Sequence, residues 1–399
     1  MLRLTLILLF IALTVVVVVK KSAQTSTSLQ RLTNTSEQAL NLNPILSDEG
    51  SVVVFESTSD LAGTGAGNGF HLLRFNTQHF SGFEEIARSR ASAVSISTDG
   101  QKIAFASTED LVGQNPDRNS EIYFFDGTLK QLTHTSPRSE LTRLTDGNFE
   151  PSLSGDGHVI AFSSNLAEIT SDSLEILLID TALNAVTQLT TSPSGTTSSH
   201  PKLTVDGRRV YFIRQKPGGT NADLMLINIT ERSTRTLAND LAELSLTTGR
   251  ALSSDGTKIV YAESTGLNQA QVFLFDLRSD AIRQLTHLGT RTTDVPLNPT
   301  ISGDGRRLTF ATRRRVVNPS DGGVELYLLD LPTGKIDQIT TAPSGATAEV
   351  LSSLSHDGST LVFNFPRMLS EPVSDPNLAT TRRSMRRYFL NDPSLVKRW

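Results

Sequence analysis

Cysteine is absent from this chain of 399 residues. Its absence excludes disulfide bonds, thiolate metal sites, cysteine nucleophiles and a lipid attached to an N-terminal cysteine. A basic excess is also missing, because 37 Lys and Arg stand against 41 Asp and Glu, for a formal net charge of −4. The chain therefore lacks the positive charge that holds nucleic-acid phosphates, and we expect no nucleic-acid partner.

Two catalytic signatures are missing as well. No Gly-x-Ser-x-Gly motif marks a hydrolase nucleophile, and the seven histidines show none of the close spacings typical of metal sites. The hydrophobic content of 37% is nevertheless sufficient for a large core. The composition is therefore that of a globular protein whose sequence carries no enzyme signature.

A long apolar run occurs only near the N-terminus. Residues 4–19 carry no charge, and they lie between Arg3 and the pair Lys20 and Lys21. A helix over this run is about 24 Å long at ~1.5 Å per residue, shorter than a ~30 Å hydrocarbon core. Two interpretations stay open: residues 1–21 are a cleaved secretory signal or an anchor in the inner membrane, and residues 22–27 are a tether. Both place the remaining chain in the periplasm or outside the cell.

A short phrase, Ser/Thr-x-Asp-Gly, recurs along the rest of the chain, each time followed by a short apolar run. Its seven copies end at Gly50, Gly100, Gly157, Gly207, Gly256, Gly305 and Gly358. The period of about 50 residues is the size of a β-propeller blade. Asp-Gly between two apolar runs predicts a tight hairpin in which both turn residues have positive φ. The first copy reads Asp48-Glu49-Gly50, so we expect its turn to be one residue longer.

Two further strand phrases complete each unit, as in residues 121–126 and in the Gln-Leu-Thr of residues 131–133. Each unit is predicted to be a four-stranded antiparallel sheet, which must stack on its neighbours to bury both faces. Residues 30–33 match a fourth strand, whereas none follows residues 387–391. We therefore expect this N-terminal strand to complete the last blade and to close residues 28–399 into an all-β, seven-bladed propeller.

These phrases resemble the repeats of TolB-like propellers, which are related to WD-repeat propellers. The resemblance is carried by the Ser-x-Asp-Gly hairpin, the strand at residues 102–107, the Ile-Tyr-Phe-Phe-Asp strand and the closing Gln-Leu-Thr. It implies an exported bacterial propeller in which the first strand of each blade lines a central channel. Such a resemblance indicates the fold much better than the function.

On that implication, the start of each first strand faces one mouth of the channel. The residues at these positions are Asn43, Ala93, Glu150, His200, Gly249, Asn298 and Leu351, with Arg250 beside Gly249. We take Asn43, Glu150, His200, Arg250 and Asn298 as candidate binding residues, the alternative being a solvated polar rim. Glu150 and His200 would become candidates for acid–base catalysis if they faced one cavity within hydrogen-bond reach.

A second candidate site is the segment Asn115-x-Asp117-x-Asn119-x-Glu121. Oxygen-bearing side chains at alternate positions are typical of calcium loops. The segment is therefore either a polar turn or a calcium site, and we expect no other cofactor.

Taken together, these patterns favour an exported, monomeric, non-enzymatic binding scaffold of the cell envelope. It would dock a protein or a glycan on one face of the ring, because a rigid ring presents many polar contacts at a low entropic cost. The alternative is an enzyme at the channel mouth, either a lyase or a glycan-active hydrolase. Membrane contact is expected only through the N-terminal anchor.

Overall fold

The computed structural model describes residues 30–35, 39–65, 67, 69–79, 81–142, 145–165, 173–266, 269–289, 297–313, 323–340, 349–365 and 386–389. The predicted signal or anchor and the predicted tether lie outside these residues. Across the described ranges the regular structure consists of β-strands, without a helix. The same ranges accordingly contain no helix that is long and apolar enough to cross a membrane.

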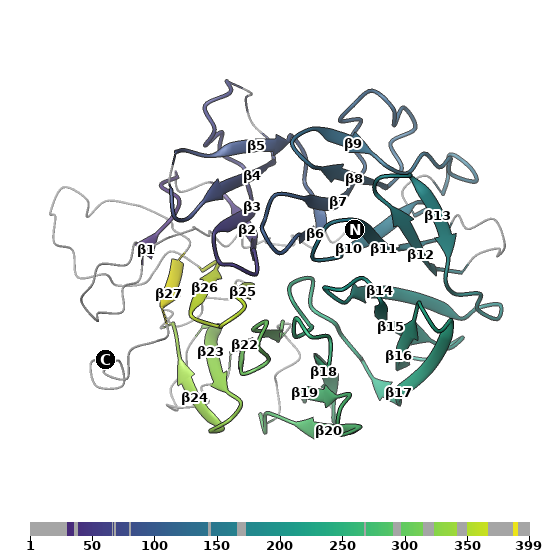
Figure 1. Cartoon of the computed structure of the whole chain (residues 1–399), viewed down its shortest axis with the longest axis vertical. Coiled ribbons are helices and arrows are strands. Elements are labelled where there is room, and N and C mark those ends of the chain that lie inside the picture. Colours follow the sequence, from purple (N-terminus) through teal and green to yellow (C-terminus); the bar gives the residue numbers. More distant parts are fainter. Residues whose placement is uncertain are drawn as a thin grey trace, which may run out of the picture.

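Antiparallel sheets are arranged as a ring in Figure 1. Five of them are four-stranded meanders: β2 (Asn41–Leu46), β3 (Val52–Ser57), β4 (His71–Asn76), β5 (Glu84–Ala87); β6 (Ser92–Ile96), β7 (Ile103–Ser107), β8 (Glu121–Phe125), β9 (Leu129–Gln131); β10 (Asn148–Leu153), β11 (Val159–Ser164), β12 (Glu175–Asp180), β13 (Ala185–Gln188); β14 (Thr197–Leu203), β15 (Arg209–Gln215), β16 (Asn221–Asn228), β17 (Ser233–Ala242); and β21 (Thr300–Ile301), β22 (Arg307–Thr312), β23 (Glu325–Asp330), β24 (Lys335–Gln338).

A sixth four-stranded sheet joins the two ends of the described chain. Its strand order is β1 (Gln30–Arg31), β27 (Arg386–Phe389), β26 (Thr360–Phe363) and β25 (Ser352–Leu354). β1 pairs antiparallel with β27, with Gln30 opposite Arg387 and Arg31 opposite Arg386. The N-terminal strand therefore lies on the outer edge of the last sheet, where the sequence placed residues 30–33.

The remaining sheet has only three strands, β18 (Lys258–Ser264), β19 (Ala270–Asp276) and β20 (Ala281–Gln284). The residues expected to form its innermost strand make two isolated bridges, Ser245 with Ala262 and Leu252 with Ile259. Residues 246–251 lie between these bridges without forming a strand. Four-stranded antiparallel blades are thus confirmed for six sheets, whereas we had predicted seven complete blades.

Apolar side chains fill the space between every pair of neighbouring sheets. Seven buried clusters do this, and each draws its members from two adjacent sheets. One of them joins the last sheet to the first, where Val362 packs with Val53 and Phe55. Middle strands such as β7 and β8 are buried at every residue because sheets cover both of their faces. Packing therefore closes the ring at the same place as the β1–β27 pair.

The recurring hairpin turn is built by local hydrogen bonds. In the second copy the Ser97 hydroxyl donates to Asp99 (2.6 Å), and the Gly100 N–H donates to the Ser97 carbonyl (3.0 Å). Gly100 has a φ of 76°, whereas Asp99 is not in the left-handed region. The prediction that both turn residues have positive φ is therefore wrong. The Ser97 N–H donates to the Lys102 carbonyl (2.9 Å), so a four-residue loop with one left-handed glycine makes this turn instead.

The first copy of the hairpin has the same length as the others, contrary to our expectation. The Gly50 N–H donates to the Ser47 carbonyl (2.9 Å), as Gly100 does to Ser97. The spacing from serine to glycine sets the turn length, and that spacing does not change. What changes is the carboxylate, because Asp48 stands one position earlier in its turn than Asp99 does.

The closing Gln-Leu-Thr phrase fastens the fourth strand to the third. Thr133 donates its hydroxyl to Glu121 and accepts the Ile122 N–H (2.8 Å), while the Gln131 amide donates to the Thr133 carbonyl (2.8 Å). The backbone N–H of the third strand is accepted in the same way by Thr190, Thr286 and Thr340. These hydrogen bonds explain why the Gln-Leu-Thr phrase recurs, so its recurrence needs no functional role.

Candidate functional site

The starts of the inner strands form one end of the channel, which we call the mouth. Five of the predicted mouth residues have left-handed backbone: Asn43 (φ 52°), Ala93 (50°), Glu150 (56°), His200 (55°) and Asn298 (43°). In the first four sheets the strand register shifts at this residue, which is a β-bulge. Bulges re-aim side chains and are common beside functional sites. Five of the seven copies therefore turn one side chain at the same place in the ring.

A cavity of about 580 Å³, the mouth cavity, opens between these strand starts. Asn43, Ala93, Gly249, Asn298 and Leu351 line it. Hydroxyl groups line it as well: Ser92, Ser107, Thr108, Ser120, Ser245, Thr247, Thr248 and Ser352. The lining of the mouth cavity thus mixes hydroxyl groups with apolar side chains, and Arg90 and Glu349 are its charged side chains.

Glu150 and His200 contact each other, as the sequence suggested for a catalytic pair. Glu150 Oε1 is 3.0 Å from His200 Nε2, and Glu150 Oε2 accepts the His200 N–H (2.7 Å) and the Ser163 hydroxyl (3.0 Å). Burial alone would raise the pKa of Glu150, but the hydrogen bond and charge of His200 outweigh it and lower this pKa. Neither Glu150 nor His200 lines the mouth cavity. The pair thus joins two sheets beside that space without lining it.

Asn43 and Asn298 also contact carboxylates. The Asn43 amide donates to Glu56 Oε2 (2.7 Å), and the Asn298 amide donates to Glu349 Oε1 (2.8 Å). Glu56 is fully buried and also accepts the Ala91 N–H of the next sheet (2.6 Å). Burial raises the pKa of Glu56 to about 7, although these hydrogen bonds and Arg90 act against the rise. The two asparagines therefore face the mouth cavity and also stabilise the rim.

Arg250 lies deeper than the other predicted mouth residues. It lines a smaller cavity of about 110 Å³, the inner cavity, and its guanidinium bonds to Asp48 in the first hairpin turn. Gly303 leaves room for this contact, because a Cβ there would lie 2.8 Å from Arg250 Nη1. Arg250 thus belongs to the opposite end of the channel, which is surrounded by the hairpin turns and which we call the turn end.

Three side chains of hydrolase type meet at the turn end. His356 Nδ1 is 3.1 Å from Ser254 Oγ and 3.3 Å from Asp48 Oδ2, and Ser254 donates to Asp48 (2.8 Å). A catalytic triad needs the serine and the aspartate on different ring nitrogens of the histidine. Here both approach Nδ1, so the arrangement is a hydrogen-bonded contact between three sheets rather than a triad.

The predicted calcium segment lies in a loop that hydrogen bonds hold together. Glu121 is buried and accepts from Thr135 and Asn148 as well as from Thr133. The Asn115 and Asn119 amides donate to the carbonyls of Asn119 (3.0 Å) and Thr135 (2.7 Å), whereas the Oδ1 atoms of both asparagines are buried without a partner.

This arrangement gives Glu121 a structural role. Calcium binding by Asn115, Asp117, Asn119 and Glu121 stays a prediction.

Sequence reasoning missed two features. Asp60, His71 and Glu85 each offer one ligand atom, all within 4.8 Å of one another, and His71 Nδ1 is 2.6 Å from Glu85 Oε2. Asp60 lies in a loop, His71 in β4 and Glu85 in β5. Their spacing along the chain gave no sign that the three side chains meet.

The other missed feature is Lys202, which lines the inner cavity. The same repeat position in the other copies holds Ile45, Ser95, Ser152, Ala251, Thr300 and Ser353. Lys202 is the single charged residue in that row, so aligning the copies would have found it.

The comparisons with known proteins concern the fold. No family model and no curated protein matches this chain. Among solved structures, an oligogalacturonate lyase from Vibrio parahaemolyticus is similar over 94% of this chain and 96% of its own, with 12% identity and a TM-score of 0.59. The chain is a β-propeller.

Two further matches have similar identities. A puromycin-hydrolyzing peptidase of Mycobacterium tuberculosis matches with 13% identity and a TM-score of 0.54, over 82% of this chain and 49% of its own. TolB from Acinetobacter baumannii matches with 15% identity and a TM-score of 0.45, over 84% of this chain and 81% of its own. A TolB protein is thus among the similar solved structures. At these identities the likeness concerns the fold and not the function.

Proposed function

We propose that this protein is an exported binding scaffold of the cell envelope, which docks a protein or a glycan at the mouth of its channel. The scaffold is a seven-bladed ring closed by β1, located in the periplasm or outside the cell and monomeric. The single observation that carries the proposal is the mouth cavity of about 580 Å³ with hydroxyl groups in its lining. Such a lining suits the hydroxyls of a glycan or the backbone of a peptide loop, which need many moderate hydrogen bonds.

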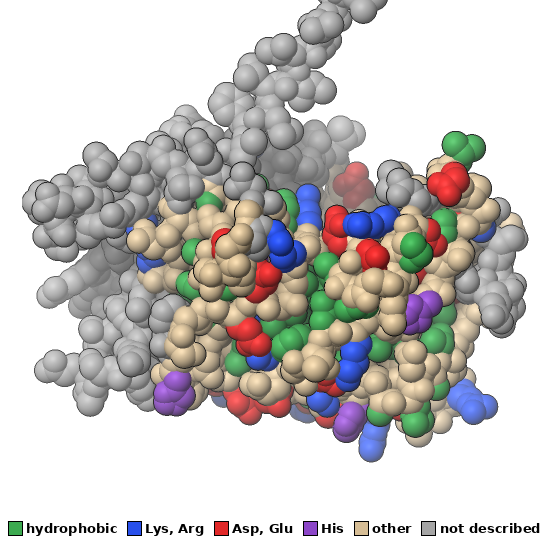
Figure 2. All heavy atoms as spheres, turned by 90° about the horizontal axis from the view of Figure 1, so that it is seen from above, with side chains coloured by type: hydrophobic (Ala, Val, Ile, Leu, Met, Phe, Trp, Pro, Cys, Tyr) green, Lys and Arg blue, Asp and Glu red, His purple; other side chains and the backbone are tan. Residues whose placement is uncertain are grey.

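The contacts around the rim support a rigid docking surface. Hydrogen bonds from Asn43 to Glu56, from His200 to Glu150 and from Asn298 to Glu349 hold these left-handed residues in place. A rim held in this way loses little conformational entropy when a partner binds. Figure 2 shows acidic and basic side chains interspersed on one side of the molecule.

In-cell photo-cross-linking tests the docking proposal. A benzophenone amino acid placed at Ser92, an exposed residue of the mouth cavity, should give one discrete adduct. The same group at Glu231, an exposed turn residue between β16 and β17, is the matched control and should give none. Equal adducts from both positions, or none from Ser92, would contradict docking at the mouth.

A second candidate function is an enzyme at the channel mouth, either a lyase or a glycan-active hydrolase. The contact between Glu150 and His200, with 3.0 Å between Oε1 and Nε2, favours it, because acid–base chemistry needs paired titratable groups. The Glu150→Gln variant separates the two functions. A scaffold should keep the Ser92 adduct in this variant, whereas loss of a measured turnover would favour the enzyme.

A further inference from the structure

The inner cavity has a lining of unusual charge. Two cations, Lys202 and Arg250, line it, and the lining contains no Asp, Glu, Asn, Gln or His side chain. Asp48 already pairs with Arg250. Lys202 is half-buried and has no hydrogen bond or ion pair with any described residue. One positive charge in this space is therefore left without a direct partner.

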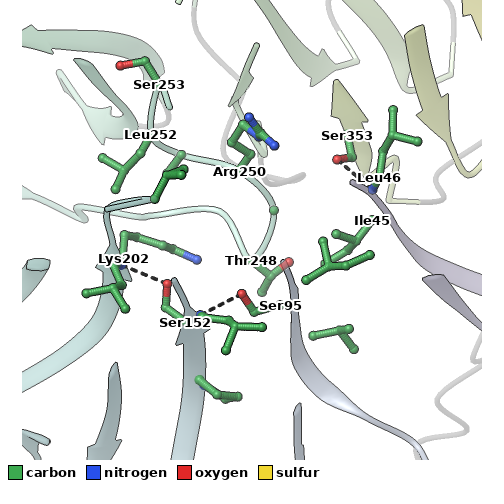
Figure 3. Close-up of a pocket in the computed structure, with 18 residues that line it drawn as sticks. Ile45, Leu46, Ser95, Ser152, Lys202, Thr248, Arg250, Leu252, Ser253 and Ser353 are labelled. Atoms are coloured by element: carbon green, nitrogen blue, oxygen red, sulfur yellow. Dashed lines mark hydrogen bonds between the residues drawn. The ribbon is translucent and has the colours of Figure 1, made fainter. Parts of the chain in front are cut away.

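Glu150 is the carboxylate whose charge acts on Lys202, but its oxygens already accept from His200 and Ser163. Burial lowers the pKa of Lys202 to about 8, and the charge of Glu150 works against that shift. The ammonium form therefore still prevails at pH 7. Lys202 reaches into the inner cavity beside Ser152 in Figure 3.

Hydroxyl groups around the same cavity are oriented as donors. Each oxygen of Ser95, Ser152 and Ser353 accepts a backbone N–H from the next sheet, from Leu153 (2.9 Å), Leu203 (2.9 Å) and Leu46 (3.1 Å). Figure 3 shows these bonds as dashed lines. Across the described ranges, none of the three hydroxyl hydrogens has an acceptor. Their hydrogens are thus available to a guest in the cavity.

The size and walls of the inner cavity narrow the class of guest. Its volume of about 110 Å³ has room for a few water-sized groups, since one water occupies about 30 Å³ in the liquid. Aliphatic side chains such as Ile45, Leu46 and Val94 form part of the wall. Ile45, Val94, Thr248 and Gly249 line both cavities, so the inner cavity adjoins the mouth cavity.

We propose that the inner cavity binds the carboxylate of a small organic acid, held by the Lys202 ammonium and by the Ser95 and Ser152 hydroxyls. One uncompensated cation selects a monoanion, hydroxyl donors complete its hydrogen bonds, and the aliphatic wall accepts a short carbon chain. This site goes beyond docking at the mouth and does not depend on it.

Propionate and its uncharged isostere propionamide test the proposal by saturation-transfer difference NMR on the full-length protein in detergent micelles. Propionate should bind saturably, and propionamide should bind about tenfold more weakly, which equals about 1.4 kcal/mol. Lys202→Met should weaken propionate binding by a similar factor, and Lys202→Arg should retain most of it. Lys335→Met, which removes an exposed lysine of β24, should change nothing.

Equal binding of the acid and the amide would overturn the proposal, as would unchanged propionate binding by Lys202→Met or no saturable binding by the wild type. The thermal midpoint of Lys202→Met should stay near that of the wild type, because Lys202 makes no hydrogen bond that the variant would lose. If this variant fails to fold, Lys202→Arg and the amide comparison still decide the question. The Ser92 adduct is read separately, so failure of this site and failure of docking at the mouth are distinguishable.

Discussion

The mouth and the turn end of the channel join their sheets through different chemical groups. At the turn end backbone atoms do so: the Thr98 N–H donates to Gly155 (2.9 Å), Gly155 to Val205 (2.9 Å) and His356 to Asp48 (2.7 Å). At the mouth side chains do so, as Glu150 and Asn298 illustrate. Backbone bonds persist whatever the side chain, whereas side-chain bonds depend on its identity. The backbone bonds between sheets at the turn end therefore tolerate changes of side chain. The bonds between sheets at the mouth depend on which side chains are present.

Long basic side chains reinforce the turn end. Lys102 Nζ donates to the Asp156 carbonyl (2.7 Å), and Lys258 Nζ donates to the Gly305 carbonyl (2.9 Å), in each case from one sheet to the next. Both turns use a carbonyl as the acceptor, so the tie again does not depend on the side chain of the neighbouring turn. Breaking the turn end should consequently cost more stability than changing the mouth.

The largest expected effect comes from filling a turn of the turn end. Gly100→Ala places a Cβ 2.4 Å from the Val52 Cβ at a φ of +76°, whereas Gly113→Ala meets nothing within 4 Å at a φ of +75°. Both variants should lose about 1 kcal/mol of unfolding free energy from the left-handed backbone. Gly100→Ala should lose about 2 kcal/mol more through overpacking. Urea denaturation measures both losses, and equal losses would contradict the close packing of this turn.

The next effect concerns the ion pair at the turn end. Asp48→Asn leaves Arg250 without its charge partner in a site where the two side chains are 7% and 18% exposed. We expect a loss of about 2 kcal/mol in unfolding free energy. Asp280→Asn is the control, because its pair with Arg235 is exposed and should contribute about 0.5 kcal/mol or less. A similar loss in both variants would mean that Arg250 does not tie the sheets together.

A pH-dependent effect is expected at the mouth. Because burial raises the pKa of Glu56 to about 7, the folded state binds a proton there more tightly than the unfolded state. The contribution of Glu56 to stability is therefore present at acidic pH and is lost as the pH rises from about 4.5 to about 7. Urea denaturation across this range should show a decline that is weaker in Glu56→Gln. Parallel curves for the two proteins would refute the assignment.

Calcium should have the smallest effect. Glu121 already accepts from Thr133, Thr135 and Asn148, so we expect no measurable change in thermal midpoint when calcium replaces a chelator. Glu121→Gln should destabilise the protein equally with and without calcium. A clear calcium-dependent rise in the midpoint of the wild type, absent in the variant, would revive the calcium interpretation.

The turn-end phrases were predictable from sequence because each copy repeats the same local chemistry. Ser97, Asp99 and Gly100 interact within one turn, so their meaning is visible in four consecutive residues. Four of the left-handed mouth positions were found in the same way, since Pro follows Asn43, Glu150, His200 and Asn298. Features that depend on a few consecutive residues and recur along the chain can be predicted from the sequence.

The remaining features depend on contacts between distant sheets. Arg250 meets Asp48 because Gly303 of an intervening sheet leaves space, which no local pattern reveals. Likewise, the inner strand is interrupted between Ser245 and Leu252, because residues 246–251 do not pair with β18 as a continuous strand. The sequence of residues 246–251 resembles that of the other first strands and gave no sign of this interruption. The unpartnered state of Lys202 is a property of the whole lining of the inner cavity.

The pairing of β1 with β27 has a consequence for how the molecule is made. One partner leaves the ribosome among the first segments, and the other emerges only after residue 386 has been synthesised. Until Val362 has been synthesised, the ring stays an open arc in which Val53 and Phe55 lack their contact with the last sheet. In a nascent chain of this protein the contact between the first and the last sheet is therefore missing. A chaperone that recognises apolar surface could bind the first sheet at this place.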